Sequence, residues 1–254
     1  MNFLAAFWRS TIGKKVVMAV TGVIMIGFVI GHVSGNLLVF RGAEAFNHYA
    51  GFLKSLGGIL YAARAGLLVS VVLHFTAAYQ LTQLARVARP VEYTRREPQV
   101  STWASRTMRW GGVLLLLFIV LHLAQFTLGW IDRDAFSETD VYNNVMIGFR
   151  NPWWVLFYEL AMVMLGFHIF HGAWSSVRTL GVAKPSRHPL HRRVAVVLGV
   201  GVWLAFSIIP AGVYFGVAKP VPAPGASTAA VVPASAHDAA RRTYVPVSAT
   251  PTTP

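Results

Sequence analysis

Histidine is the residue type in this chain with the clearest potential for chemistry, because most of its copies lie in an apolar setting. Of nine histidines, the ones inside long apolar stretches are His32, His74, His122, His168 and His171. An ionisable side chain at membrane depth is costly and indicates a functional site by default. Hydrogen bonding between helices is the alternative for any single one of them.

The stretches that hold these histidines are membrane-spanning by length and composition. The chain has 254 residues, of which 55% are hydrophobic and 12% charged, whereas soluble domains average about 25% charged residues. A run of about 20 apolar residues crosses a bilayer, and it must be helical because lipid offers no hydrogen-bond partners to the backbone. The sequence therefore predicts an all-α, five-helix transmembrane bundle, with helices near residues 16–40, 65–85, 110–131, 153–177 and 194–217.

Positive charge gathers in the segments predicted on one side of the membrane. The net charge is +13. The cations concerned are Arg9, Lys14 and Lys15, the arginines between residues 86 and 109, and Arg178, Lys184, Arg187, Arg192 and Arg193. The positive-inside rule places the N-terminus in the cytoplasm and the C-terminus outside. These topology signals account for most of the charge, and no basic soluble face is left for nucleic acid.

Two regions differ in composition. Residues 1–217 hold the five predicted helices, preceded by a short amphipathic lead-in over residues 1–15 that suits the membrane interface. Residues 218–254 are rich in Pro, Ala, Ser and Thr, which predicts a disordered external tail without a catalytic role. The chain has no cysteine, so disulfides, thiolate haem ligation and protein-bound iron–sulfur clusters are excluded.

Helix direction sorts the histidines of the first four helices into two levels. His32 and His122 lie past the midpoints of helices that run outward, and His74 and His168 lie past the midpoints of helices that run inward. Two imidazoles at one depth suit ligation of a haem iron from both sides, each through one ring nitrogen while the other N–H needs an acceptor. Two such levels predict two stacked haems and an electron path across the membrane.

The pair His168 and His171 is ambiguous. Their side chains are about 60° apart around the helix and roughly 4.5 Å apart along it, so they cannot both ligate one iron from the same face. We expect one ligand and one supporting residue that contacts a propionate or a neighbouring helix. Spacing alone leaves open which is which.

Small and basic residues near the histidines fit a haem but also have simpler explanations. The glycines are Gly27, Gly31 and Gly35 in the first helix and Gly166 and Gly172 in the fourth. They leave room for a flat macrocycle or for close helix packing. Arg64 and Arg178 are placed to bind propionates of the outer and inner haem, respectively. Anchoring at the membrane interface is the alternative for each arginine.

Two motifs resemble those of a known family. The segment "STIGKKVVMAVTGVIMIGFVIGHVSGNLLVFRGAEAFNHYAGFL" (residues 10–53) resembles the first-helix signature of the single-subunit, di-haem cytochrome b anchors of succinate dehydrogenases and fumarate reductases. The segment "FHIFHGAWSSVRTLG" (residues 167–181) resembles the fourth-helix signature. The five-helix layout also matches, so the resemblance covers roughly residues 5–217.

The resemblance implies a concrete function. Such a subunit anchors a flavoprotein and an iron–sulfur subunit on the cytoplasmic face of a bacterial membrane, where dicarboxylate chemistry takes place on the partner. It carries two b haems and exchanges electrons with a quinone, commonly menaquinone. The family ligands correspond to His32 and His122 for the outer haem and to His74 and His168 for the inner one, which selects His168 over His171.

The sequence departs from the family at one acidic position. Some fumarate reductases of this type have a glutamate two residues before the fourth-helix ligand, and Gly166 stands there instead. Glu159 is the acid inside a predicted helix, and we expect it at an outer quinone site or proton path. Snorkelling to the surface, or pairing with Arg150 or Arg64, is the alternative. At the level of the whole chain, the alternatives are a di-haem subunit of another quinone-linked oxidoreductase and a proton-coupled transporter with a histidine relay.

Overall fold

The fold is described from a computed structural model that covers residues 2–88, 102–182 and 189–221. The chain divides into two units, Met1–Pro220 and Val221–Pro254. The first unit holds every helix given below. The predicted tail beyond residue 221, and the basic residues Arg89, Arg95, Arg96, Lys184 and Arg187, lie outside the described residues.

Within the described part of the chain, five helices are long and apolar enough to cross a membrane, as predicted. They are α2 (Thr11–Asn36), α4 (Gly58–Val87), α5 (Trp103–Phe126), α7 (Pro152–Thr179) and α8 (Pro189–Tyr214). Even α5, with 24 residues, is about 36 Å long at 1.5 Å per residue, enough to cross the hydrocarbon core. The chain is therefore an all-α, multi-pass membrane protein.

Polar residues just ahead of the apolar runs set where several helices begin. The side chains of Ser10, Thr102 and Asn151 each accept a hydrogen bond from a backbone N–H in the first turn of α2, α5 and α7. These N-caps start each helix before the apolar run. At its other end α5 stops at Phe126, so the predicted extension to residue 131 is wrong. Gly129 adopts φ +62° in the following turn, a conformation that glycine permits.

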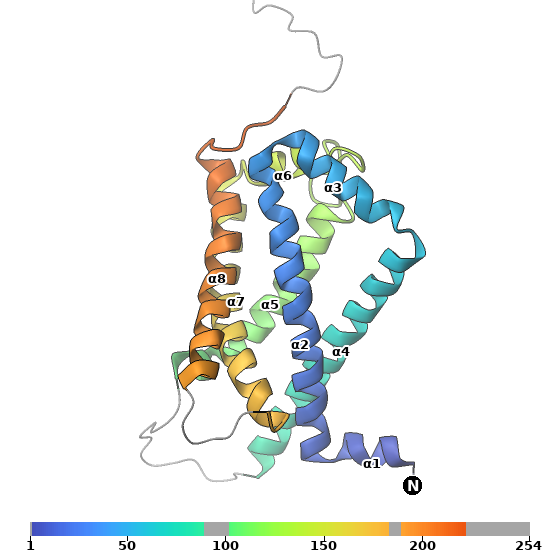
Figure 1. Cartoon of the computed structure of the whole chain (residues 1–254), viewed down its shortest axis with the longest axis vertical. Coiled ribbons are helices and arrows are strands. Elements are labelled where there is room, and N and C mark those ends of the chain that lie inside the picture. Colours follow the sequence, from blue (N-terminus) through green and yellow to red (C-terminus); the bar gives the residue numbers. More distant parts are fainter. Residues whose placement is uncertain (1, 89–101, 183–188, 222–254) are drawn as a thin grey trace, which may run out of the picture. The chain divides into compact units, whose positions relative to one another are not determined.

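Shorter helices lie at the two ends of the spanning helices. The lead-in forms α1 (Phe3–Arg9), and the opposite end carries the 3-10 helix η1 (Leu37–Arg41), α3 (Ala43–Ser55) and α6 (Val141–Gly148) (Figure 1). Lys14 is only 6% exposed, and its ammonium donates to the Trp8 and Arg9 carbonyls at 2.8 and 3.0 Å. This lysine therefore caps the C-terminal end of α1, where orphan carbonyls need donors.

The spanning helices pack unequally. α7 packs most extensively on α8, and α2 packs on α4, while α5 and α2 both contact α7. At the α7–α8 contact, a Cβ on Gly166 would lie 3.0 Å from the Trp203 Cβ atom and 3.1 Å from the Gly199 carbonyl oxygen. Gly166 therefore allows close packing of α7 on α8. This agrees with the alternative that the glycines serve helix packing. Gly35 is similar, because its missing Cβ makes space for the Tyr49 ring.

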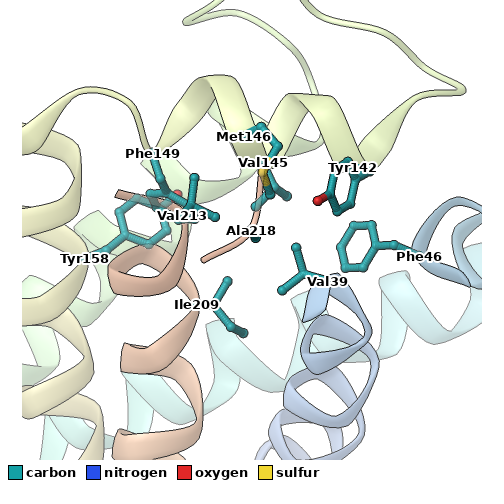
Figure 2. Packing of buried hydrophobic residues seen from close by; sticks show 10 residues of the cluster. All are labelled: Val39, Phe46, Tyr142, Val145, Met146, Phe149, Tyr158, Ile209, Val213 and Ala218. Atoms are coloured by element: carbon teal, nitrogen blue, oxygen red, sulfur yellow. The ribbon is translucent and has the colours of Figure 1, made fainter. Parts of the chain in front are cut away.

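A hydrophobic cluster closes the end that carries α3 and α6. Figure 2 shows its members from η1, α3, α6, α7 and α8, among them Phe46, Met146, Phe149, Tyr158 and Val213. Met146 and Val39 are 1% exposed. This core fixes the first turns of α7 against α6 and α8, and thereby the position of Tyr158.

Asp140 ties α6 to α3, so its loss should destabilise this end of the protein. Its carboxylate caps α6 by accepting from the Asn143 backbone at 3.2 Å, and it accepts from the Asn47 side chain at 3.0 Å. We expect Asp140→Ala to lower the free energy of unfolding by about 1 kcal/mol, the usual value of an N-cap. Thermal unfolding of the detergent-solubilised chain measures it, and an unchanged midpoint would contradict the capping role.

The contribution of the Asp140 carboxylate to the free energy of unfolding depends on pH. Partial burial acts to raise the pKa of Asp140, but hydrogen bonds from Asn47 and Asn143 outweigh it and hold the pKa below its usual value. A carboxyl pKa that is lower in the folded state stabilises the fold above the unfolded-state pKa of about 4. This contribution is lost as the pH falls through the folded-state pKa, and it should be missing at every pH in Asp140→Ala.

Candidate functional site

The histidines of α2 and α5 face each other. The ring centroids of His32 and His122 are 5.8 Å apart, with the ring planes at 84°. Phe28 stacks on His32 at 5.2 Å, and Phe118 stacks on His122 at 5.5 Å. The two imidazoles thus lie in an apolar, aromatic setting, one from each helix.

The histidines of α4 and α7 form a second facing pair. The ring centroids of His74 and His168 are 6.0 Å apart, with the ring planes at 51°. His74 also lies against α2, because the Thr21 hydroxyl is 3.2 Å from its Nδ1 atom. The structure therefore brings together the same two pairs that helix direction predicts.

The pairs lie at two different depths along the spanning helices. On α2, Thr21 lies at the depth of the His74–His168 pair, because it contacts His74. His32 lies on the same helix and belongs to the other pair. Eleven residues of α-helix separate Thr21 from His32, which is about 16 Å along the axis. The His74–His168 pair is nearer the end that carries α1, and the His32–His122 pair is nearer the end that carries α3 and α6.

Two of the histidines have one ring nitrogen engaged by a residue that sequence reasoning missed. His122 Nδ1 is 3.3 Å from the Tyr158 hydroxyl, which donates in turn to Gln125 Oε1 at 2.9 Å. His74 Nδ1 is held by Thr21, whose hydroxyl donates to the Val17 carbonyl at 2.7 Å. Both arrangements leave Nε2 as the free nitrogen. The signal for them in the sequence is weak, because a threonine and a tyrosine in apolar helices carry no pattern of their own.

The other two histidines differ in their contacts. His168 Nδ1 is buried and has no hydrogen-bond partner in the part of the chain that the structure describes. The Asn36 amide nitrogen lies 3.3 Å from Nδ1 and 3.4 Å from Nε2 of His32, and it donates to the His32 carbonyl at 2.7 Å. A buried ring nitrogen without a protein partner is costly, which makes His168 a candidate for binding a group from outside the chain.

His171 and Arg178 are not members of either facing pair of histidines. Both line a cavity of about 690 Å³ near the ends of α2, α5, α7 and α8. Its walls also carry the cations Lys15 and Arg192 and hydroxyls that include Ser105 and Ser175. The Arg178 guanidinium lies 5.6 Å from the Trp174 ring centroid. The cavity is therefore suited to acidic groups, and His171 belongs to its wall.

Arg64 has a different environment. It is exposed on α4, and its guanidinium lies 5.8 Å from the centroid of the Tyr61 ring one turn earlier. A contact within one exposed helix favours the role of an interface anchor. Its predicted contact with a propionate stays a prediction.

The open glycines are not equivalent. A Cβ on Gly27, Gly31 or Gly172 would have no neighbour within 4 Å. Gly27 and Gly31 are exposed and lie 100° or more around α2 from His32. Gly172 is half-buried and lies one turn after His168 on nearly the same side of α7. Gly172 is thus the glycine whose open space adjoins a histidine pair.

Glu159 is the only acid in the five spanning helices described above. Its Oε1 atom and the Ser207 hydroxyl on α8 are both buried, and these two groups interact with each other. It follows Tyr158 directly, so it lies at the level of the His32–His122 pair. This carboxylate oxygen is buried and does not reach the membrane surface. The alternative that Glu159 snorkels to the surface is therefore disfavoured.

The fold and the pairs together define a class of protein. It is a multi-pass helical membrane protein that holds two pairs of facing imidazoles at two depths. Among the described residues, no three His, Cys, Asp or Glu side chains gather as metal ligands. Each pair presents two imidazoles that face each other, an arrangement that would fit a metal whose other ligands come from a macrocycle.

Comparison with known proteins finds similarity to one family of membrane subunits. Residues 86–208 match the model of the succinate dehydrogenase/fumarate reductase transmembrane subunit. The succinate dehydrogenase cytochrome b558 subunit of Bacillus subtilis (strain 168) is 26% identical over 189 residues, which is 74% of this chain and 88% of that protein. No solved structure matches. The resemblance seen in the two motifs is confirmed: the chain is similar to the transmembrane subunits of succinate dehydrogenases and fumarate reductases.

Proposed function

We propose that this chain is the di-haem cytochrome b anchor of a succinate:quinone oxidoreductase. In this role it passes electrons between a soluble iron–sulfur subunit and a membrane quinone, with menaquinone as the expected species. The observation that carries the proposal is the pair of facing imidazoles at each of two depths, His32–His122 and His74–His168. The similarity to a cytochrome b558 subunit supports haem b as the group they bind.

The residues of both pairs fit haem iron. Imidazole ligates a metal through one ring nitrogen, and the other nitrogen is usually held by a second group. His74 and His122 have this arrangement through Thr21 and Tyr158. His168 has a buried nitrogen without a partner, and open space adjoins it at Gly172. When bound, haem iron supplies reversible one-electron transfer.

The cavity at the α1 end suits the acidic edge of the haem held by His74 and His168. Haem propionates need cations or hydrogen-bond donors. Arg178 and His171, both predicted for this role, line the cavity together with Lys15 and Arg192. Arg178 would bind a propionate by a charge-assisted hydrogen bond, and His171 would donate from its ring without ligating iron.

Charge supports an orientation and a docking side. The positive-inside rule places the α1 end in the bacterial cytoplasm and the C-terminus outside. By the same rule the basic segment 86–109, part of which lies outside the described residues, is cytoplasmic, and it is the proposed docking segment for the flavoprotein and iron–sulfur subunits. Dicarboxylate oxidation or reduction takes place on those partners.

Glu159 is our candidate for the quinone site. It lies at the level of the outer pair, and its Oε1 atom is buried, with the Ser207 hydroxyl as its neighbour. Reduction of a quinone to a quinol consumes two protons with two electrons, so a carboxyl group near the quinone has a use as a proton donor. Glu159 would supply or accept such a proton, with Ser207 beside it.

A haem assay tests the proposed function. The full chain, purified in detergent, should contain two haems b per polypeptide by the pyridine haemochrome method. One haem would show that one histidine pair has another role. Absence of haem b from a folded, membrane-extracted protein would rule out the proposal as a whole.

A further inference from the structure

We propose that Tyr158 and Gln125 are positioning residues that hold His122 in the form that binds iron. This inference rests on the proposed function, because it concerns how the chain prepares one haem ligand. His122, Tyr158 and Gln125 form a hydrogen-bonded chain from α5 to α7 and back to α5, with contacts of 3.3 and 2.9 Å.

The direction of the hydrogen bonds decides which ring nitrogen of His122 carries the proton. A phenol has a single proton, and that of Tyr158 is donated to Gln125 Oε1. The contact between Tyr158 and His122 must then be donated by the ring, from Nδ1–H. This tautomer leaves a lone pair on Nε2, which is the atom free to ligate a metal.

The two ends of the Gln125 amide have different surroundings. Gln125 is 2% exposed. Its Oε1 atom accepts from the Tyr158 hydroxyl, whereas its Nε2 atom is buried and has no hydrogen-bond partner among the described residues. The amide oxygen is therefore the end that holds the Tyr158 proton, and this orientation sets the direction of the hydrogen-bonded chain.

Tyr158 is held so tightly that its hydroxyl has little freedom. It is 5% exposed. Four phenylalanine rings surround it, with centroid distances of 4.9 Å to Phe149, 5.0 Å to Phe118, and 6.1 Å to both Phe126 and Phe157. Such aromatic contacts fix the ring position. A phenylalanine fits the same cage, so the hydroxyl can be removed without a change in packing.

In the second histidine pair, a different kind of hydrogen bond holds the ring of His74. His74 Nδ1 lies against the Thr21 hydroxyl, which donates to a backbone carbonyl of its own helix. The His122 ring is held by a phenol that is polarised by an amide, and linked hydrogen bonds of this kind strengthen one another. Tyr158 and Gln125 therefore act on the His32–His122 haem and not on the other one.

Tyr158→Phe in the full chain tests the assignment, with Tyr142→Phe as the matched control. Tyr142 is also buried, at 4% exposure, but its hydroxyl donates to the Lys219 carbonyl and contacts no histidine. Loss of the Tyr158 acceptor makes the His122 ring less basic, which disfavours ferric iron. We expect both variants to bind two haems. In Tyr158→Phe alone, the oxidised-to-reduced ratio of the His32–His122 haem at fixed potential should fall about tenfold, a positive shift of about 59 mV for one electron.

Gln125→Met gives a second readout that does not depend on potential. Without the amide oxygen, the Tyr158 proton turns toward His122 Nδ1 and favours the tautomer protonated on Nε2, which competes with the metal. We expect retention of the His32–His122 haem during detergent purification to fall about 10–100-fold, the usual effect of losing a supporting group.

The possible outcomes are distinct. Unchanged potentials in Tyr158→Phe, or an equal shift in Tyr142→Phe, would overturn the positioning role and leave the proposed function intact. A wild-type protein without haem b would overturn the proposed function itself. Full haem retention in Gln125→Met would show that Gln125 does not set the tautomer.

Discussion

Replacing His168 by alanine is expected to remove the haem held by the His74–His168 pair and to leave the other haem in place. His168 faces His74 at a ring distance of 6.0 Å and has a buried nitrogen without a protein partner. Loss of one axial imidazole in an apolar site leaves the iron without its second strong ligand. The pyridine haemochrome assay should fall from two haems per chain to one.

His171→Ala is the matched control, since it removes an imidazole from the same helix only three positions away. His171 lines the cavity with Arg178 and Lys15 instead of facing another histidine. We expect His171→Ala to retain both haems. Loss of a haem in His171→Ala together with retention in His168→Ala would reverse the choice of ligand. The redox component that remains in His168→Ala also identifies the His32–His122 haem for the Tyr158→Phe titration.

Hydrophobic patterning explains why the large features could be predicted from the sequence. Each spanning helix is a local apolar run, and its direction follows from the count of membrane crossings. The depth of a histidine then needs only its distance from the middle of its run. His74 and His168, 94 residues apart in the sequence, were placed at one level in this way, and the structure brings their rings together.

The missed features depend on how helices rotate against one another. Thr21 and Tyr158 reach their histidines only because α2 and α7 turn these side chains toward the bundle interior. The sequence shows the helical period but not which neighbour each face meets. Gly166 and Gly172 illustrate this, since one packs on α8 and the other adjoins open space. The short helices α3 and α6 were missed for a related reason, because their stability comes from the cluster around Phe46 and Met146.

Glu159→Gln is expected to lower quinone-coupled turnover of the assembled complex by about 100-fold, the lower range for loss of a general acid or base. Glutamine preserves the size of the side chain and its hydrogen-bonding capacity but cannot exchange a proton. Electron transfer from succinate to a soluble dye on the partner subunits should be unchanged, because it does not require the membrane quinone site. Haem content should also stay at two per chain, since Glu159 is not part of either histidine pair.

The neighbouring Tyr158→Phe variant separates this proton role from a general disturbance of the outer end of α7. Tyr158 and Glu159 follow each other in the chain, but the first contacts His122 and the second faces α8. Quinone turnover in Tyr158→Phe should change far less than in Glu159→Gln, while the haem potential should shift only in Tyr158→Phe. Equal losses of turnover in both variants would mean that the outer end of α7 is damaged as a whole. Unchanged turnover in Glu159→Gln would place the quinone site elsewhere, because the five spanning helices described here contain no second acid.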